Sequence, residues 1–514
     1  MMIRRRHINL SVEEIEKSID TEILTKFPYT FVEKFCLLPL KDAPGRVVFA
    51  TDDPSKIDAG EIEHFTGKKV SFVIGDRQII LSLLKKHYYS PTSSQKIIQE
   101  LSRDEEMFDD ALAEELSSQN GDLLDLANQA PIIRLVNQIF YRAIMMRASD
   151  IHLQSLENTF KVRYRIDGML HDILTLPAKY QSAVISRVKI ISDLDIAEKR
   201  IPQDGRTSVR VEDKQVDVRV SIIPTFFGES AVLRLLDQSS YNFGLNDLGF
   251  SDTDLERFDR LIHYDHGIIL LTGPTGSGKT TTLYAALSRI NNPHIHIITL
   301  EDPVEYQIEG INQIQVNPKV GLTFANGLRS ILRHDPNVIM VGEIRDRETA
   351  EMAIQASLTG HLVFSTLHTN DSTSSITRLL DMGIEPYLIA SSLIGIIAQR
   401  LVRLNCSKCS QSTTYPEVLL REIGLDPNSD GYNFMEGRGC EYCLHTGYHG
   451  RTGIFEFLQI DDEIRNLIMK QVSSGEIRRY SLSKGLKTLR MDGARKVAQG
   501  LTTVSEVLRV TQET

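Results

Sequence analysis

The sequence contains no tryptophan, only five cysteines and no apolar stretch as long as a membrane-spanning helix. The longest such stretch, YLIASSLIGIIAQRLV at 387–402, falls short of about 20 residues and is interrupted by Ser391, Ser392 and Gln399. No apolar segment follows the basic start MMIRRRHINL, so a secretory signal is not expected. We expect a cytoplasmic protein in which 387–402 forms a buried helix.

Basic residues are outnumbered, since 58 Lys and Arg face 68 Asp and Glu and the net charge is -10. Non-specific binding to nucleic acid needs a concentrated basic surface that neutralises phosphates. We therefore expect no nucleic-acid partner. The 41% hydrophobic and 25% charged content over 514 residues is typical of a globular protein of about two to four domains.

Hydropathy patterns divide the chain into four parts. Residues 1–100 predict a small β-α-β-α module. The segment from 104 to 133 has no Lys or Arg and begins with clustered acidic residues, which predicts a solvated linker at 101–129. A middle α/β domain follows at 130–238. From 239 to 514, apolar strands alternate with helical segments, as a parallel sheet requires.

Two local patterns in the middle domain predict antiparallel strands. FKVRYRIDG at 160–168 alternates as a strand and ends in an Asp-Gly turn. RTSVRVEDKQVDVRVS at 206–221 has two alternating arms joined at EDK, which predicts a hairpin.

The strongest motif is a glycine-rich segment between an apolar strand at 268–272 and an amphipathic helix. Its glycines let the backbone fold tightly, so that N–H groups and the helix N-terminus face phosphates. Lys279 would contact the β and γ phosphates, and the Thr280 hydroxyl would hold Mg²⁺. An ordinary glycine-rich turn is the alternative, which the flanking strand and helix disfavour. The predicted nucleotide-binding residues are Gly273, Pro274, Thr275, Gly276, Ser277, Gly278, Lys279, Thr280 and Thr281.

A second buried strand, in VIMVGEIRD at 338–346, ends at Glu343. Ligands of parallel sheets bind at the carboxyl ends of strands, which would bring Glu343 beside the phosphate loop. A carboxylate there can orient and polarise a water for in-line attack on the γ phosphate, or help to position Mg²⁺ through water. A surface glutamate after a strand is the alternative.

Polar clusters follow two further apolar strands. HIITLEDPVEY places Glu301, Asp302 and Glu305 beyond one strand, and HLVFSTLHTND places His368 beyond another. His361 and His368 are candidate phosphate sensors, although a structural histidine is the commoner case for either alone. We expect four strand ends to converge on one nucleotide.

Four of the five cysteines form two Cys-x-x-Cys pairs, CSKC and CEYC. This spacing suits a structural tetrahedral Zn²⁺ with four thiolate ligands and no open position for catalysis. Disulfides are the alternative, which an expected cytoplasmic location disfavours. We predict a zinc insert at 404–446, while Cys36 is expected to be a buried core thiol. The predicted zinc ligands are Cys406, Cys409, Cys440 and Cys443.

Four of these motifs resemble, in order and spacing, those of the ATPases of type II secretion, type IV pilus and related machines. That family combines a phosphate loop, an acidic box, a strand ending in Gly-Glu and a histidine box, which here are GPTGSGKT, ITLEDPVEY, VIMVGEIRD and GHLVFSTLHT. The resemblance implies an α/β fold with a RecA-like P-loop motor domain, preceded by a smaller PAS-like domain and the N-terminal module. It also implies ATP and Mg²⁺ as cofactors, Glu343 as general base and His368 near the γ phosphate.

The resemblance further implies a homohexameric ring in which arginines of one subunit act at the site of its neighbour. Charge accumulates on the phosphoryl oxygens in the transition state, which an arginine can stabilise. A solvated or structural salt bridge is the alternative for each candidate. The arginines that match by motif are Arg219, Arg234, Arg329, Arg333 and Arg345.

The tetracysteine insert is similar to that of type II secretion and pilus assembly ATPases, whereas retraction motors and conjugation-type ATPases generally lack it. The implied function is to power pseudopilus assembly and protein export by a type II secretion system, with a type IV pilus assembly ATPase as the alternative. The implied partner is the cytoplasmic domain of an inner-membrane platform protein, which would place the chain at the periphery of that membrane. A nucleic-acid motor and a non-hydrolysing scaffold are the remaining hypotheses.

Overall fold

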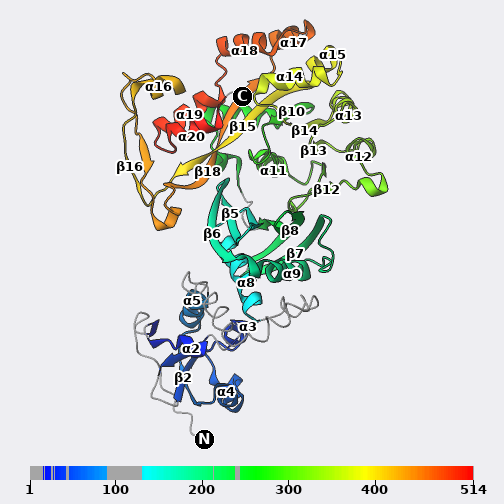
Figure 1. The fold of residues 1–514 in the computed structure, drawn as a ribbon. Helices are drawn as coiled ribbons and strands as arrows, with labels where there is room; N and C mark the ends of the chain where they lie inside the picture. The colour runs from blue at the N-terminus through cyan, green and yellow to red at the C-terminus, as the bar shows by residue number, and fades with distance from the viewer. Residues whose placement is uncertain are drawn as a thin grey trace. The chain divides into compact units, whose positions relative to one another are not determined.

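The computed structural model describes residues 15–16, 18–24, 27, 29–41, 46–88, 130–211, 214–237 and 243–512. Figure 1 shows the chain with its helices and strands. It divides into two compact units, Met1–Leu235 and Leu236–Thr514. The acidic linker predicted at 101–129 lies outside the described residues.

The N-terminal module is built on a three-stranded sheet of order β1-β2-β3. Strands β2 and β3 pair in parallel, and α4 connects them, which confirms the predicted β-α-β-α pattern. Helix α4 begins at the N-cap Asp58 and ends at Gly67, whose φ of 64° is the left-handed conformation of a helix C-cap. Its elements are α2 (Thr21–Leu24), α3 (Tyr29–Lys34), β1 (Leu38–Lys41), β2 (Arg46–Thr51), η1 (Pro54–Lys56), α4 (Ala59–Thr66), β3 (Lys69–Ile74) and α5 (Arg77–Tyr88).

Residues 130–237 form a six-stranded sheet of order β6-β5-β4-β9-β8-β7 with two long helices. The predicted hairpin is confirmed, because β7 and β8 pair antiparallel from Gln203 opposite Ile222 to Val211 opposite Lys214. The predicted Asp167-Gly168 turn joins β5 to β6, and both residues have positive φ. The elements are α8 (Ala130–Met145), β4 (Asp150–Ser155), β5 (Thr159–Ile166), β6 (Met169–Pro177), η2 (Ala178–Tyr180), α9 (Gln181–Ile191), β7 (Gln203–Val211), β8 (Lys214–Thr225) and β9 (Gly228–Asp237).

The second unit contains a seven-stranded sheet of order β12-β11-β13-β14-β10-β15-β18. Its strands pair in parallel except β18, which is antiparallel to β15. The strands are β10 (Gly267–Thr272), β11 (Ile297–Glu301), β12 (Asn312–Gln315), β13 (Val338–Val341), β14 (Leu362–Leu367), β15 (Leu393–Asn405) and β18 (Tyr448–Gln459). The short strands β16 (Ser410–Ser412) and β17 (Met435–Gly437) form a separate pair.

Helices cover both faces of this sheet (Figure 1). Side chains alternate along each strand, so Ile268 and Leu270 belong to one core and Ile269 and Leu271 to the other. The helices are α10 (Asp252–Leu261), α11 (Lys279–Ile290), α12 (Phe324–Ile331), α13 (Arg347–Leu358), α14 (Ser372–Asp381), α15 (Pro386–Ser392), α16 (Glu417–Ile423), α17 (Asp462–Met469), α18 (Ser474–Ser483), α19 (Leu489–Ala498) and α20 (Val504–Val510). Single 3-10 turns are η4 (Leu245–Leu248), η5 (Pro318–Val320) and η6 (Glu441–Cys443).

The prediction that 387–402 forms one buried helix is wrong. Helix α15 ends at Ser392, and the next residue begins the long strand β15. Cores lie on both faces of the sheet at this strand, with Ile396 in one and Ile397 in the other, so its apolar residues show no alternation. A continuous apolar run does not distinguish such a strand from a buried helix. In the described part of the chain, no helix is long and apolar enough to cross a membrane.

Candidate active site

The glycine-rich loop connects β10 to the N-terminus of α11, as predicted. Gly273, Gly276 and Gly278 have φ values of 149°, 78° and 87°, a region that residues with a side chain rarely adopt. A Cβ atom at Gly273 would lie 2.5 Å from the backbone oxygen of Gln399, and one at Gly278 would lie 2.8 Å from Nε2 of the same residue. The glycines therefore also allow β15 to approach the loop.

The side chains of this loop are arranged to receive an anion. Among the described residues, the hydrogen bonds of Lys279 Nζ stay within the loop, where it donates to the oxygens of Gly273 at 2.7 Å and Pro274 at 3.1 Å. Burial lowers the pKa of Lys279 to about 8, an effect that Glu343 opposes and Arg400 strengthens. The buried Oγ of Ser277 has no hydrogen-bond partner among the described residues. A phosphate group would supply an acceptor for Ser277 and an anionic partner for Lys279.

Glu343 lies at the carboxyl end of β13, close enough to Lys279 to raise the pKa of that lysine. The backbone before it is fixed, because Gly342 N donates to Leu300 O at 2.8 Å. Oε1 of Glu343 accepts a hydrogen bond from Arg345, and Oε2 lies 3.4 Å from Nε2 of His368. Burial raises the pKa of Glu343, but Arg345 and His368 outweigh it and hold that pKa below its usual value.

The strand order explains why these residues meet. Strands β11, β13, β14 and β10 are consecutive neighbours, and all run parallel. Glu343 follows β13 and His368 follows the adjacent strand β14. Both are therefore brought together beside the loop that follows β10. His361 lies at the opposite end of β14, where its Nδ1 is 2.8 Å from the oxygen of Ala356 at the end of α13.

Glu301 is buried at the end of β11, and both of its carboxylate oxygens are already used. Oε1 accepts from Thr299 at 2.5 Å and from Gln313 at 3.2 Å, while Oε2 accepts from the hydroxyl of Tyr284. Burial raises the pKa of Glu301, and these hydrogen bonds oppose that shift. The backbone N–H of Glu305 donates to the same Tyr284 hydroxyl at 3.4 Å. Glu301 thus holds Tyr284 of helix α11 in place.

The five predicted arginines are spread over both units of the chain. Arg345 lies at the site, where it pairs with Glu343. Arg329 pairs with Glu348 at 2.5 Å, and Arg333 donates to the backbone oxygen of Arg329 at 2.9 Å. In the other unit, Arg219 lies on β8, and Arg234 on β9 pairs with Asp150 at 3.0 Å. The side chains of Arg234 and Arg345 are 57% and 63% exposed, so more than half of each remains accessible to solvent.

Two residues at the loop were not predicted, Gln399 and Arg400 of β15. Oε1 of Gln399 accepts from Thr282 of α11 at 2.8 Å, and Nη2 of Arg400 donates to both oxygens of Asn370, at 3.1 and 3.2 Å. They were missed because the segment 387–402, which contains both, was predicted to be a helix. A strand assignment for LIGII would have placed AQR at the carboxyl end of a neighbour of β10.

The four cysteines of the two Cys-x-x-Cys pairs come together, and their sulfur atoms lie within 4.8 Å of one another. The Sγ pairs 406–440, 409–443 and 440–443 are 3.9, 3.8 and 3.7 Å apart, and none of the four forms a disulfide. A tetrahedral zinc ion with bonds of about 2.3 Å would place its sulfurs about 3.8 Å apart. The cluster therefore fits zinc. Cys36 is a buried thiol, as predicted.

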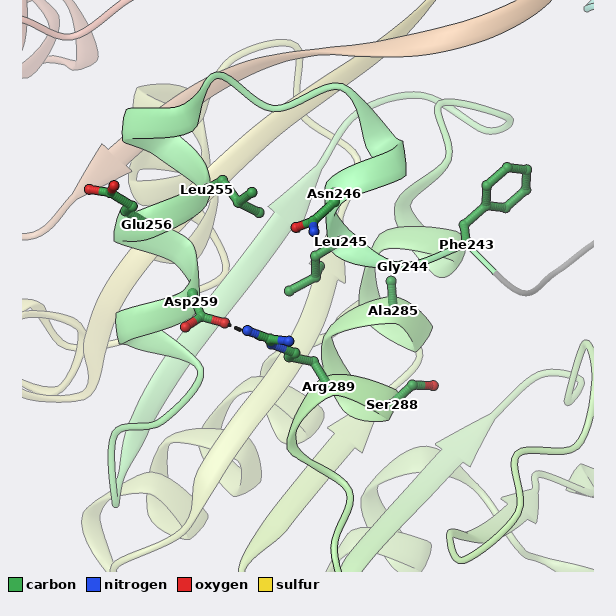
Figure 2. A pocket seen from close by; sticks show the side chains of 10 residues that line it. All are labelled: Phe243, Gly244, Leu245, Asn246, Leu255, Glu256, Asp259, Ala285, Ser288 and Arg289. Carbon is green, nitrogen blue, oxygen red and sulfur yellow. Dashed lines mark hydrogen bonds and ion pairs between the residues drawn. The ribbon is translucent and has the colours of Figure 1, made fainter.

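A separate cavity of about 410 Å³ lies between η4, α10 and the C-terminal half of α11. Figure 2 shows its lining, in which Arg289 pairs with Asp259 at 3.1 Å. None of the predicted site residues lines it.

Comparison with known proteins identifies the family. The model of the "Type II/IV secretion system protein" family matches residues 125–509. The chain belongs to this family. The model of the MshEN domain matches residues 8–94.

Several curated relatives match over most of the chain. The type II secretion system protein E of Pseudomonas aeruginosa is 47% identical, over 88% of this chain and 89% of its own. Its namesake from Dickeya dadantii is 45% identical, over 96% and 98%. The type II secretion system ATPase E of Vibrio cholerae is 50% identical, over 78% and 80%. The chain is therefore a secretion ATPase, as the motifs predict.

Solved structures agree on the fold. The pilus retraction motor PilT with bound ADP matches with a TM-score of 0.50 and 29% identity, over 73% of this chain and 96% of that one. The ATPase DotB of Legionella pneumophila matches with a TM-score of 0.54 and 22% identity, over 73% and 94%. The second likeness supports the fold alone.

Proposed function

We propose that this ATPase works as a homohexamer and powers pseudopilus assembly and protein export by a type II secretion system. The single observation that carries the catalytic part is the position of Glu343, which Arg345 and His368 hold close enough to Lys279 of the phosphate loop to raise the pKa of that lysine. The assignment to a type II secretion system is supported by the names of relatives that are 45 to 50% identical to this chain.

In the proposed mechanism, the loop residues 273–281 bind the phosphates of ATP. Nζ of Lys279 then donates to phosphate oxygens in place of the backbone oxygens of the loop, and Ser277 gains the acceptor that it lacks. Thr280, exposed at the start of α11, is the residue that would hold Mg²⁺, which neutralises charge that builds up on the phosphates. Glu343 orients the attacking water and accepts its proton. His368 holds the carboxylate from the neighbouring strand.

Arginines of an adjacent subunit would complete the site. Arg345 and Arg234 carry exposed guanidinium groups, and Arg219, Arg329 and Arg333 are the other candidates. An arginine supplied in trans can accelerate phosphoryl transfer by about 10³- to 10⁵-fold, so that hydrolysis would require the ring. Such a dependence predicts a specific activity that rises with protein concentration.

Zinc would bind the tetracysteine cluster and stabilise the insert at 404–446. Backbone N–H groups of Cys440 and Gly447 donate to Sγ of Cys443 at 3.2 and 3.3 Å, as expected around a thiolate ligand. With four sulfurs on one ion, this metal would have a structural role.

The N-terminal module would bind the cytoplasmic domain of an inner-membrane platform protein, and so bring the ATPase to that membrane from the cytoplasm. The alternative is a type IV pilus assembly ATPase, since pilus machines also use a motor of this fold, the retraction motor PilT. The full chain should be purified from membranes of its own host with its bound proteins. A type II secretion platform protein supports the proposal, whereas a pilus platform protein supports the alternative.

A further inference from the structure

Two positively charged side chains meet at the phosphate loop, Lys279 from α11 and Arg400 from β15. A Cβ atom built at Gly273 would lie 3.0 Å from Nη1 of Arg400, so the guanidinium lies directly against the first residue of the loop. Burial lowers the pKa of both side chains; for Lys279, the carboxylate of Glu343 opposes this shift and the charge of Arg400 adds to it. The two positive charges repel each other in this partly buried site, and a bound anion would reduce that repulsion.

The contacts of Arg400 within the chain leave its charge unpaired. Nη1 donates to the backbone oxygen of Gln399 at 3.3 Å, and Nη2 donates to the backbone and side-chain oxygens of Asn370. All three acceptors are neutral. Asp371 and Glu456 favour the charged form of Arg400 from a distance, but their carboxylates accept hydrogen bonds from the first turn of α14 instead. Within the described chain, Arg400 forms no ion pair.

We propose that Arg400 binds the nucleotide phosphates in cis, together with Lys279. A guanidinium offers a planar pair of N–H donors that matches phosphate oxygens better than it matches a single amide oxygen. The unpaired Oγ of Ser277 in the same loop is an independent sign that an anion belongs there. Because β15 pairs with β10 along the register from Ile268 to Thr272, the position of Arg400 relative to the loop is fixed by the sheet. It needs no neighbouring subunit.

The first test is the substitution Arg400→Gln in the full chain, with Arg421→Gln, at an exposed position of α16, as the matched control. Arg400→Gln should weaken the binding of Mg-ATP by about 10- to 100-fold, the usual effect of removing a charged hydrogen bond. Binding of adenosine, which has no phosphate, should change by less than about twofold, and so should both ligands with the control. Calorimetry measures all of these, and thermal unfolding without nucleotide verifies the fold.

The second test uses the unsubstituted protein, so that it holds even where the variant does not fold. Phenylglyoxal modifies exposed guanidinium groups, and mass spectrometry reads the modification at each arginine. Mg-ATP and inorganic pyrophosphate should each protect Arg400, while adenosine should not, and Arg421 should react equally in all samples. A folded Arg400→Gln protein that binds ATP normally would overturn the proposal. Modification of Arg400 that is indifferent to both phosphate ligands would overturn it as well.

Discussion

Nε2 of His368 lies 3.4 Å from Oε2 of Glu343, so that the ends of two adjacent strands share one carboxylate. Arg345 donates to the other oxygen of the same group. These two neighbours outweigh the effect of burial and keep the pKa of Glu343 below its usual value. Glu343 is therefore a fixed, ionised acceptor beside the phosphate loop, in the state that a water-orienting carboxylate requires.

Glu343→Gln should remove this acceptor while leaving the shape of the site. We expect turnover to fall by about 10²- to 10⁴-fold, with ATP binding kept or tightened, because the phosphate loop is untouched. Phosphate release and nucleotide affinity measure the two effects. Glu351→Gln is the matched control, since Glu351 pairs with Arg347 on the surface of α13. Unchanged turnover in Glu343→Gln would support a non-hydrolysing scaffold instead.

The two histidines of the β14 motif should respond differently to substitution by Gln. His368 faces Glu343, so His368→Gln should lower kcat by about tenfold or more and leave the melting temperature nearly unchanged. His361 contacts Ala356 O and Thr359 at the end of α13, so His361→Gln should cost about 1 kcal/mol of stability with little effect on kcat. Steady-state kinetics and thermal unfolding separate the two outcomes. Equal losses of kcat would contradict the assignment.

The phosphate loop and the strand-end carboxylate could be predicted because each is local. Gly273, Gly276 and Gly278 require positive φ, and a carboxyl end of a buried parallel strand points to the ligand whatever the rest of the fold does. Arg400 could not be predicted in the same way. Its position depends on β15 inserting between β10 and β18, and a strand buried on both sides has the same apolar pattern as a buried helix.

The acidic box, ITLEDPVEY, could be predicted only in part. Its place beyond β11 was predictable, but Glu301 turns to Tyr284, Thr299 and Gln313, which come from different parts of the chain. Side-chain partners of this kind follow from tertiary packing. The catalytic role of Glu301 stays a prediction.

The affinity for ATP should depend on pH through Lys279. Burial holds its pKa at about 8, so below pH 8 the free protein already carries the charge that phosphate binding needs. Above pH 8 the group must take up a proton on binding, and affinity should fall by up to about tenfold per pH unit. Calorimetry in two buffers of different ionisation enthalpy would measure this proton uptake. An affinity that is constant from pH 7 to 9.5 would contradict the prediction.

Removal of zinc should unfold the insert at 404–446. Structural zinc contributes on the order of 10 kcal/mol, and the elements that the structure describes within the insert, β16, β17, α16 and η6, are all short. A strong chelator, or Cys409→Ser, should increase hydrogen exchange in this segment and abolish a zinc content of about one ion per chain. Cys36→Ala is the control, because Cys36 is a buried thiol of the N-terminal module and should leave the zinc content intact.

Glu506 should make the C-terminal part of the motor domain sensitive to acid. Burial raises its pKa, but hydrogen bonds from Arg509 and Arg403 outweigh burial and hold the pKa at about 2, below the ordinary value of 4.5. The folded state therefore keeps this carboxylate ionised where the unfolded state would bind a proton. The resulting stabilisation, about 3 kcal/mol, is fully present above about pH 5 and is lost as the pH falls towards 2.

Glu506→Gln should remove this stabilisation at neutral pH, since it leaves two arginines facing a neutral amide. Denaturant unfolding of the variant and the natural chain at pH 7 and pH 4 measures the difference, which should shrink as the pH falls. The matched control is Glu417→Gln, because Glu417 pairs with Arg421 on the surface of α16 and is exposed. A Glu506→Gln protein with the same unfolding midpoint as the control at pH 7 would show that the buried pair contributes nothing to stability.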